Sequence, residues 1–377
     1  MDIGGMVQPG FERVREAFAE NFTSRAEVGA ACCVYRNGVP VVDIWGGQAD
    51  PVSGRAWQRD TLALVFSVAK GPTAVCIHRL VEQGLLDIDV PIAHYWPEFA
   101  AAGKEHITTR MVLSHRAGLA AVAGNLTLEE VLAWDPVVAA IAAQTPNWPP
   151  GSAHGYHARS FGWILGEIIR RITGESAGAY LARTICTPLG LDYWVGLPAA
   201  QLPRCARLIP PPAELSAAAV LGADSLTVRV MSGPSGLFGY NEMWNRPEVL
   251  AAEMPSSNGV GSARALARFY AACCTEVDGI RLLQPETLRD ATRVASRGPD
   301  RVVLVETCFG LGFSLPPMLG QGLGAHAFGH PGAGGALAFA DPEAGVGFAY
   351  VMNRMQFDPG GDPRSAALTR ALYESLS

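Results

Sequence analysis

The sequence predicts an α/β (α+β) fold, in which strands from both ends of the chain form one antiparallel sheet flanked by helices. A mainly helical lobe is expected between these strands. Strand patterns at both ends and helical periodicity in the middle support this architecture. The 377 residues, of which 49% are hydrophobic and 17% charged, exceed one usual core and supply a large buried interior. We expect residues 1–66 and 265–377 to form the sheet lobe and residues 67–264 the helical lobe.

The N-terminal quarter combines a helix, a hairpin and a second helix. Asn37-Gly38 stands between two apolar runs, which is a strong local signal for a β-hairpin. A later apolar run meets a helical pattern at Ser67, and Gly84 ends that pattern. The predicted elements are a helix at 12–21, strands at 29–35, 39–45 and 62–66, and a helix that continues to about residue 82.

Helical patterns dominate the middle of the chain, and strand patterns return near its end. The most periodic helix is expected at 161–172, before Gly174. A Pro/Ala-rich stretch at 201–223 is interpreted as a segment that runs over the protein surface. Short apolar runs near the C-terminus, separated by Gly, Pro and Asp, are interpreted as strands. The other predicted helices are 108–113, 127–134, 136–143, 176–186, 262–273 and 364–375, and the predicted strands are 309–314, 325–329, 335–340 and 345–353.

Composition argues against several classes of function. The net charge of -6, without a basic stripe, is not typical of a nucleic-acid-binding protein. No apolar run is long enough to span a membrane, and the start of the chain does not resemble a signal peptide, so we expect a cytoplasmic protein. The eight cysteines follow no C-x-x-C or metal-binding spacing. We therefore expect reduced thiols, no metal and no cofactor.

Ser67 and Lys70 are the first candidates for chemistry. Only Lys70 and Lys104 are lysines among the 29 basic residues, and Lys70 follows Ser67 by three positions at the predicted helix start. This spacing places hydroxyl and amine on one helix face. An amine whose pKa is lowered by apolar surroundings can take the proton of an attacking serine. A lysine that extends its amine into water would give the same pattern, so the pair is a hypothesis.

Two further segments offer groups that such a site needs. Tyr156 follows two prolines on a loop before the helix at 161–172. Its hydroxyl can relay a proton there, or its ring can simply pack against the start of the helix. His154 and His157 flank it, but no third ligand stands at zinc spacing. The glycine-rich segment 328–336 can leave backbone N–H groups free to bind an oxyanion. A tight turn at the start of a strand, with no role in the chemistry, would also explain these glycines.

The order of these candidate groups along the chain resembles that of the class C β-lactamase and penicillin-binding protein superfamily. A serine-lysine pair comes first, a loop tyrosine second and a glycine-rich strand segment third. The chain is most similar to the family VIII carboxylesterases, from about residue 10 to the end. The resemblance implies a β-lactamase/transpeptidase-like fold with the active site at the interface of the two lobes. Besides FSVAKG at 66–71, it rests on GLLDIDVP at 84–91, YWPEF at 95–99, LSHRAGL at 113–119, FGW at 161–163 and GHPG at 329–332.

The resemblance also implies roles for individual residues. Ser67 would be acylated, while Lys70 and Tyr156 would share general acid and base duty. The backbone N–H groups of Ser67 and Ala333 would form the oxyanion hole. His330 would occupy the first place of the family's K-T-G triplet and line the substrate pocket.

Two positions depart from the family's pattern and bear on the substrate. Ala158 stands where members that hydrolyse β-lactams usually carry asparagine, and His330 replaces the triplet lysine ahead of Gly332. Both changes remove recognition of a carboxylated amide ring, so an uncharged small-molecule ester is expected. We predict a carboxylesterase for short- to medium-chain esters that works through an acyl-enzyme. An acyltransferase, a weak β-lactamase and a non-catalytic binding module remain as alternatives.

Overall fold

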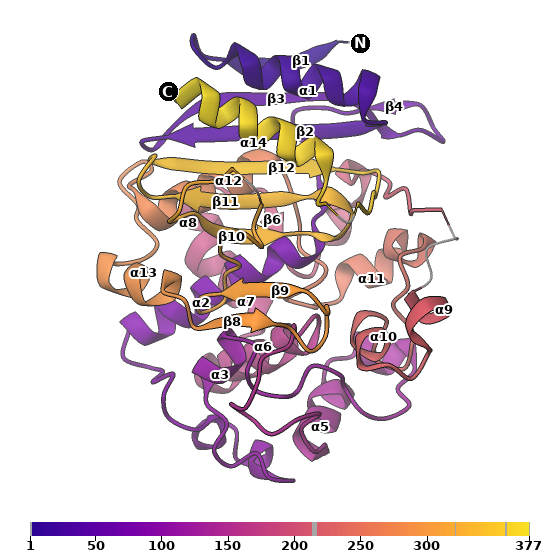
Figure 1. The fold of residues 1–377 in the computed structure, drawn as a ribbon, viewed down its shortest axis with the longest axis vertical. Helices are drawn as coiled ribbons and strands as arrows, with labels where there is room; N and C mark the ends of the chain where they lie inside the picture. The colour runs from indigo at the N-terminus through magenta and orange to yellow at the C-terminus, as the bar shows by residue number, and fades with distance from the viewer. Residues whose placement is uncertain (1, 213–216, 321, 359, 377) are drawn as a thin grey trace.

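The computed structural model describes residues 2–212, 217–320, 322–358 and 360–376 (Figure 1). Within these residues, the main sheet has seven strands in the order β1-β3-β2-β12-β11-β10, with β4 paired to β3, and every pairing is antiparallel. The predicted fold class is confirmed. Its strands are β1 (Ile3–Val7), β2 (Gly29–Arg36), β3 (Val39–Asp50), β4 (Arg55–Ala56), β10 (Phe328–Pro331), β11 (Leu337–Asp341) and β12 (Val346–Met352).

The two ends of the chain meet in the middle of this sheet. Strand β2 pairs with β3 through the predicted turn, where Asn37 and Gly38 have φ of 49° and 83°. The other edge of β2 pairs with β12, and Tyr350 lies opposite Cys32. This pairing explains why strand patterns occur at both termini.

Helices cover both faces of the sheet. In Figure 1, α1 (Glu12–Ser24) and α14 (Pro363–Leu376) lie side by side across one face. On the other face, α12 (Ala263–Cys274) contacts β2, β11 and β12. The apolar side of each helix is buried against the sheet, as the sequence periodicity predicts.

Short helices make up most of the rest of the chain, together with two small sheets. The α-helices are α2 (Lys70–Glu82), α3 (Thr109–Leu113), α4 (Leu128–Leu132), α5 (Asp135–Ala143), α6 (Ser160–Thr173), α7 (Ala177–Leu181), α8 (Thr187–Leu189), α9 (Ala217–Leu221), α10 (Leu226–Met231), α11 (Pro247–Ala251) and α13 (Pro285–Thr292). The small sheets are β5-β7-β6 (Ala63–Leu64, Val260–Gly261, Tyr193–Trp194) and the hairpin β8-β9 (Ser296–Pro299, Glu306–Phe309). The division into lobes at residues 66 and 264 stays a prediction.

The predicted strand at 309–314 is wrong in its position. Strand β9 ends at Phe309, and the chain then bends through Gly310 and Gly312. Gly312 has φ of 90°, and a Cβ there would lie 2.2 Å from the Cβ of Ala74 in α2. The close crossing over α2 therefore requires glycine and interrupts the strand.

Other boundaries differ by a few residues. The strand expected at 325–329 lies at β10, and the helix expected at 176–186 continues from α7 into a π-helical turn at Ala182–Cys186. The stretch 201–223 contains the end of the 3-10 helix Ala199–Arg204 and also α9, and residues 213–216 lie outside the described residues. Strands β1, β4, β6, β7 and β8 were not predicted.

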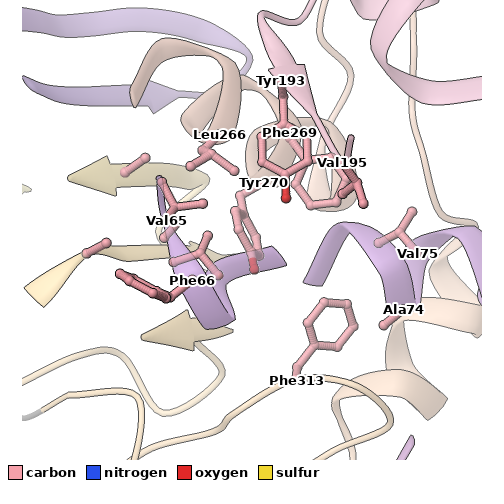
Figure 2. Packing of buried hydrophobic residues seen from close by; sticks show 14 of the residues in the cluster. Val65, Phe66, Ala74, Val75, Tyr193, Val195, Leu266, Phe269, Tyr270 and Phe313 are labelled. Atoms are coloured by element: carbon pink, nitrogen blue, oxygen red, sulfur yellow. The ribbon is translucent and has the colours of Figure 1, made fainter. Parts of the chain in front are cut away.

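Helix α2 begins in a tightly packed part of the core. Figure 2 shows Tyr270 of α12 and Phe313 pointing toward its first turns. A Cβ at Gly71 would lie 2.1 Å from the Tyr270 hydroxyl oxygen. Glycine next to Lys70 therefore lets α12 approach and fixes the first turn of α2. In the part of the chain that the structure describes, no helix is long and apolar enough to cross a membrane; the expected cytoplasmic location stays a prediction.

Candidate active site

Ser67 lies in a 3-10 turn, Phe66–Ala69, that leads directly into α2. The preceding residue, Phe66, has φ of 46°, a left-handed conformation that is unfavourable for a non-glycine residue. Its ring packs edge-on against Tyr240 and Trp244, with centroid distances of 5.7 and 5.0 Å. This packing holds the strained turn and fixes the backbone at Ser67.

Lys70 is fully buried and lies one turn after Ser67. Its Nζ is 3.2 Å from Ser67 Oγ. It also donates hydrogen bonds to the carbonyl oxygens of Ala158, at 2.7 Å, and Ser256, at 3.0 Å. Among the described residues, no carboxylate forms an ion pair with it.

The charge of Lys70 depends on its burial and on the absence of a carboxylate partner among the described residues. Desolvation, and then the positive charge of Arg159, hold the pKa of Lys70 well below its usual value. A neutral amine has two hydrogens and one lone pair. Because the two carbonyls take both hydrogens, the lone pair is left to accept the Ser67 hydroxyl proton.

Tyr156 contacts Ser67 from a distant loop. Its hydroxyl donates to Ser67 Oγ at 2.7 Å, and its ring centroid is 4.7 Å from Lys70 Nζ. Burial raises the pKa of Tyr156, an effect that the hydrogen bond to Ser67 partly opposes. The phenol is therefore protonated at neutral pH. The structure brings the three predicted polar groups together.

Asp300 holds the Tyr156 loop in place, although the sequence analysis did not single it out. This buried side chain accepts hydrogen bonds from the backbone N–H of Tyr156, at 3.1 Å, and from those of Val302 and Val303. Thr307 donates to its other oxygen. The ring of Phe309, from the same hairpin, stacks on Tyr156 at 6.2 Å.

We expect Asp300→Ala to lower kcat about tenfold or more, because Tyr156 loses the anchor that orients it. Asp300→Asn retains an oxygen acceptor and should lose less. Steady-state kinetics, with circular dichroism as a check of folding, would measure both variants. Equal kcat in the folded Asp300→Ala variant and the wild type would contradict this role.

The glycine-rich turn after β10 lies against the residues before Ser67. A Cβ at Gly332 would be 2.3 Å from the carbonyl oxygen of Val65, so only glycine permits this approach. Gly332 itself donates to Ala336. The backbone N–H groups of Ser67 and Ala333 donate to no described residue, and both residues line one hollow. They are available to a substrate oxygen.

His330 is buried beside the catalytic candidates, with its ring centroid 5.9 Å from that of Tyr156. Burial lowers the pKa of His330 to about 3, and the nearby Lys70 acts in the same direction. The imidazole is therefore neutral at pH 7. Its Nδ1 is 2.7 Å from the carbonyl oxygen of Pro331, which makes Nδ1 the donor and Nε2 an acceptor. Within the described residues, Nε2 has no hydrogen-bond partner.

The hollow above Ser67 is small, with a cavity volume of about 20 Å³. Ala158 lies in its wall, at the position where the family pattern has asparagine. The sequence analysis missed four of its lining side chains, those of Arg159, Met231, Tyr240 and Ser257, because neither spacing nor motif distinguishes them. The lining residues are Phe66, Ser67, Tyr156, Ala158, Arg159, Met231, Tyr240, Ser257 and Ala333. Among the described residues, no group of three or more His, Cys, Asp or Glu side chains is arranged to hold a metal.

Comparisons with known proteins agree with this architecture. The esterase/beta-lactamase LipL of Mycobacterium tuberculosis is 38% identical over 362 residues, covering 94% of this chain and 83% of LipL. The crystal structure of a family VIII carboxylesterase has a TM-score of 0.91 and 37% identity, with both chains fully covered. EstA from Arthrobacter nitroguajacolicus has a TM-score of 0.89 and 34% identity, covering 100% of this chain and 99% of EstA. Because residues 14–372 match the Beta-lactamase family, this chain belongs to that family, as the motif order predicted.

Proposed function

We propose that this protein is a serine carboxylesterase that cleaves short- to medium-chain esters through an acyl-enzyme on Ser67. One observation carries the proposal: Ser67 Oγ lies 3.2 Å from the buried Lys70 amine and 2.7 Å from the Tyr156 hydroxyl. These three groups supply a nucleophile, a base and an acid in one place. The esterase relatives support ester hydrolysis by this chain.

In acylation, Ser67 Oγ attacks the ester carbonyl carbon while its proton moves to the neutral Lys70 amine. The carbonyl oxygen becomes an oxyanion, which the N–H groups of Ser67 and Ala333 stabilise. The intermediate then collapses, and the bond to the alcohol oxygen breaks. Tyr156 gives its proton to the departing alkoxide and regains one from the Lys70 ammonium. The acyl-enzyme is left with both groups in their starting states.

Deacylation repeats these steps with water. Lys70 takes a proton from water, with Tyr156 as relay, and the oxygen attacks the acyl carbon. When the bond to Ser67 Oγ breaks, the proton returns to the serine and the carboxylic acid leaves. A different alcohol in place of water would give acyl transfer, because both reactions share one acyl-enzyme.

An ester is favoured over a β-lactam because of two side chains. Ala158 has no side-chain amide to bind the lactam's acylamino group. His330 is neutral at pH 7, since burial lowers its pKa to about 3, so it supplies no positive charge at the position of the K-T-G lysine. Hydrolysis of nitrocefin is therefore expected to be slow compared with that of p-nitrophenyl butyrate.

A fluorophosphonate probe tests the proposal. We expect one covalent adduct, located on Ser67 by peptide mass spectrometry, together with loss of p-nitrophenyl butyrate hydrolysis. Ser67→Ala should abolish both the adduct and turnover. Ser53→Ala, at an exposed serine, serves as the matched control and should retain both. Activity that survives Ser67→Ala would overturn the assignment.

A further inference from the structure

Arg159 is a buried cation in the wall of the hollow above Ser67. Its guanidinium donates to the carbonyl oxygens of Val230, at 3.1 Å, Met231, at 2.8 Å, and Phe238, at 3.4 Å. It also packs over the ring of Phe238, 4.8 Å from the centroid. Nε is buried and has no hydrogen-bond partner among the described residues.

No carboxylate in the described part of the chain forms an ion pair with Arg159. Burial lowers its pKa to about 10, so the side chain is still charged at neutral pH. A buried charge without a counter-charge is costly. Carbonyl dipoles reduce this cost but do not neutralise the charge, so the site can still bind an anion.

The rest of the hollow also provides donors rather than anions. The hydroxyl groups of Tyr240 and Ser257 line it and form no hydrogen bond with a described residue. Burial holds the pKa of Lys70, the other nearby basic side chain, well below its usual value and so favours its neutral form. The hollow therefore combines one fixed positive charge and two available hydroxyls with the nucleophile Ser67. This set of groups fits a carboxylate.

We propose that Arg159 recognises a carboxylate at the far end of a short acyl chain, so that preferred substrates are monoesters of short dicarboxylic acids. This inference rests on the proposed esterase function. The acyl side is favoured because the acyl group stays bonded to Ser67 inside a small hollow, whereas the alcohol must leave.

This inference changes the uncharged substrate expected from the sequence. The loss of the K-T-G lysine at His330 removes positive charge from one side of Ser67. Arg159 provides positive charge on another side, next to Ala158 and the Tyr156 loop. The two positions are not equivalent, so an anionic acyl group remains compatible with poor recognition of β-lactams.

Ethyl hydrogen succinate and ethyl levulinate provide the test. Their acyl chains have the same length and number of non-hydrogen atoms, but only the succinate ends in a charge. Hydrogen bonds to charged groups are strong enough for a preference on the order of tenfold or more in kcat/KM. Chromatographic detection of the released acids would give this ratio for the wild-type protein at pH 7. A ratio of one or less would overturn the inference.

Two variants locate the origin of the preference. Arg159→Met removes the charge and should lower the succinate-to-levulinate ratio to about one or below. Arg159→Lys retains the charge and should keep part of the preference. If Arg159 only anchors residues 230–238, both esters will lose kcat/KM equally, and the inference is overturned. Hydrolysis of p-nitrophenyl butyrate separates this result from failure of the proposed function, because a wild-type protein that cleaves no ester contradicts the function itself.

Discussion

Lys70→Arg is expected to lower kcat by about 10²–10⁴-fold, the usual contribution of a general base. A guanidinium cannot give up its proton at neutral pH, so Ser67 would face a permanent cation. The larger head group must also fit where two carbonyl oxygens bind the present amine. Single-turnover kinetics with p-nitrophenyl butyrate would measure the acylation step. Retained turnover in a folded Lys70→Arg variant would assign the base to Tyr156.

The pH profile provides a second measurement of the same base. Because the active form is the neutral amine, kcat/KM should fall as the pH decreases through the lowered pKa of Lys70. Three of the buried histidines nearby have lowered pKa values. Burial lowers the pKa of His157 to about 4 and that of His330 to about 3, and it holds the pKa of His115 well below its usual value. These three rings are therefore neutral near pH 7.

The same pKa shift affects stability, with a sign that follows from proton binding. Between the lowered pKa of Lys70 and its usual value near 10.5, the unfolded chain binds a proton that the folded protein does not. The free energy of unfolding contributed by this group therefore rises with pH in that range. Lys70→Met has no such group. Urea titrations should show a smaller slope against pH in Lys70→Met than in the wild-type protein.

Strong local patterns explain which parts of the fold could be predicted. The Asn37-Gly38 turn and the periodic helix α6 are specified by neighbouring residues, so they lie close to their predicted positions. Strand β1 was missed because its sequence, IGGMV, contains two glycines and has little strand character. It is an edge strand that becomes ordered by pairing with β3.

The candidate site was predictable where a motif marks it and not where long-range contacts form it. Ser67 and Lys70 are three residues apart, and their spacing alone suggests their proximity. Asp300 binds the backbone of Tyr156 across 144 positions in the sequence. The left-handed Phe66 also gives no sequence signal, because neighbouring rings rather than glycine stabilise its conformation. Such features follow from tertiary packing.

Arg364→Met is expected to lower the free energy of unfolding by about 3–5 kcal/mol, the usual cost of breaking a buried ion pair. The Arg364 side chain is fully buried. It forms ion pairs with Glu27, at 3.2 Å, and Asp362, at 2.6 Å. Methionine would fill much of the space but would leave the buried Glu27 carboxylate without its cation. Tyr350 and the backbone N–H of Val28 would still donate to it.

The same variant should also affect catalysis, because Arg364 binds the turn that carries Ala333. Its Nη2 donates to the carbonyl oxygen of Gly334 at 2.8 Å, and the N–H of Gln356 donates to the same oxygen at 3.0 Å. Loss of one of these two bonds should loosen the turn and lower kcat at temperatures where the variant is still folded.

Urea denaturation and kinetics on the same samples would separate the two effects of Arg364→Met. Arg370→Met is the matched control, because Arg370 lies on the same helix α14 and is exposed. Its free energy of unfolding should change by no more than about 0.5 kcal/mol. If Arg364→Met lost less than that control limit, the Glu27 and Asp362 pairs would contribute no net stability. An unchanged kcat in the destabilised variant would instead show that Gln356 alone is sufficient to hold the Gly334 carbonyl, and with it the Ala333 N–H, in position.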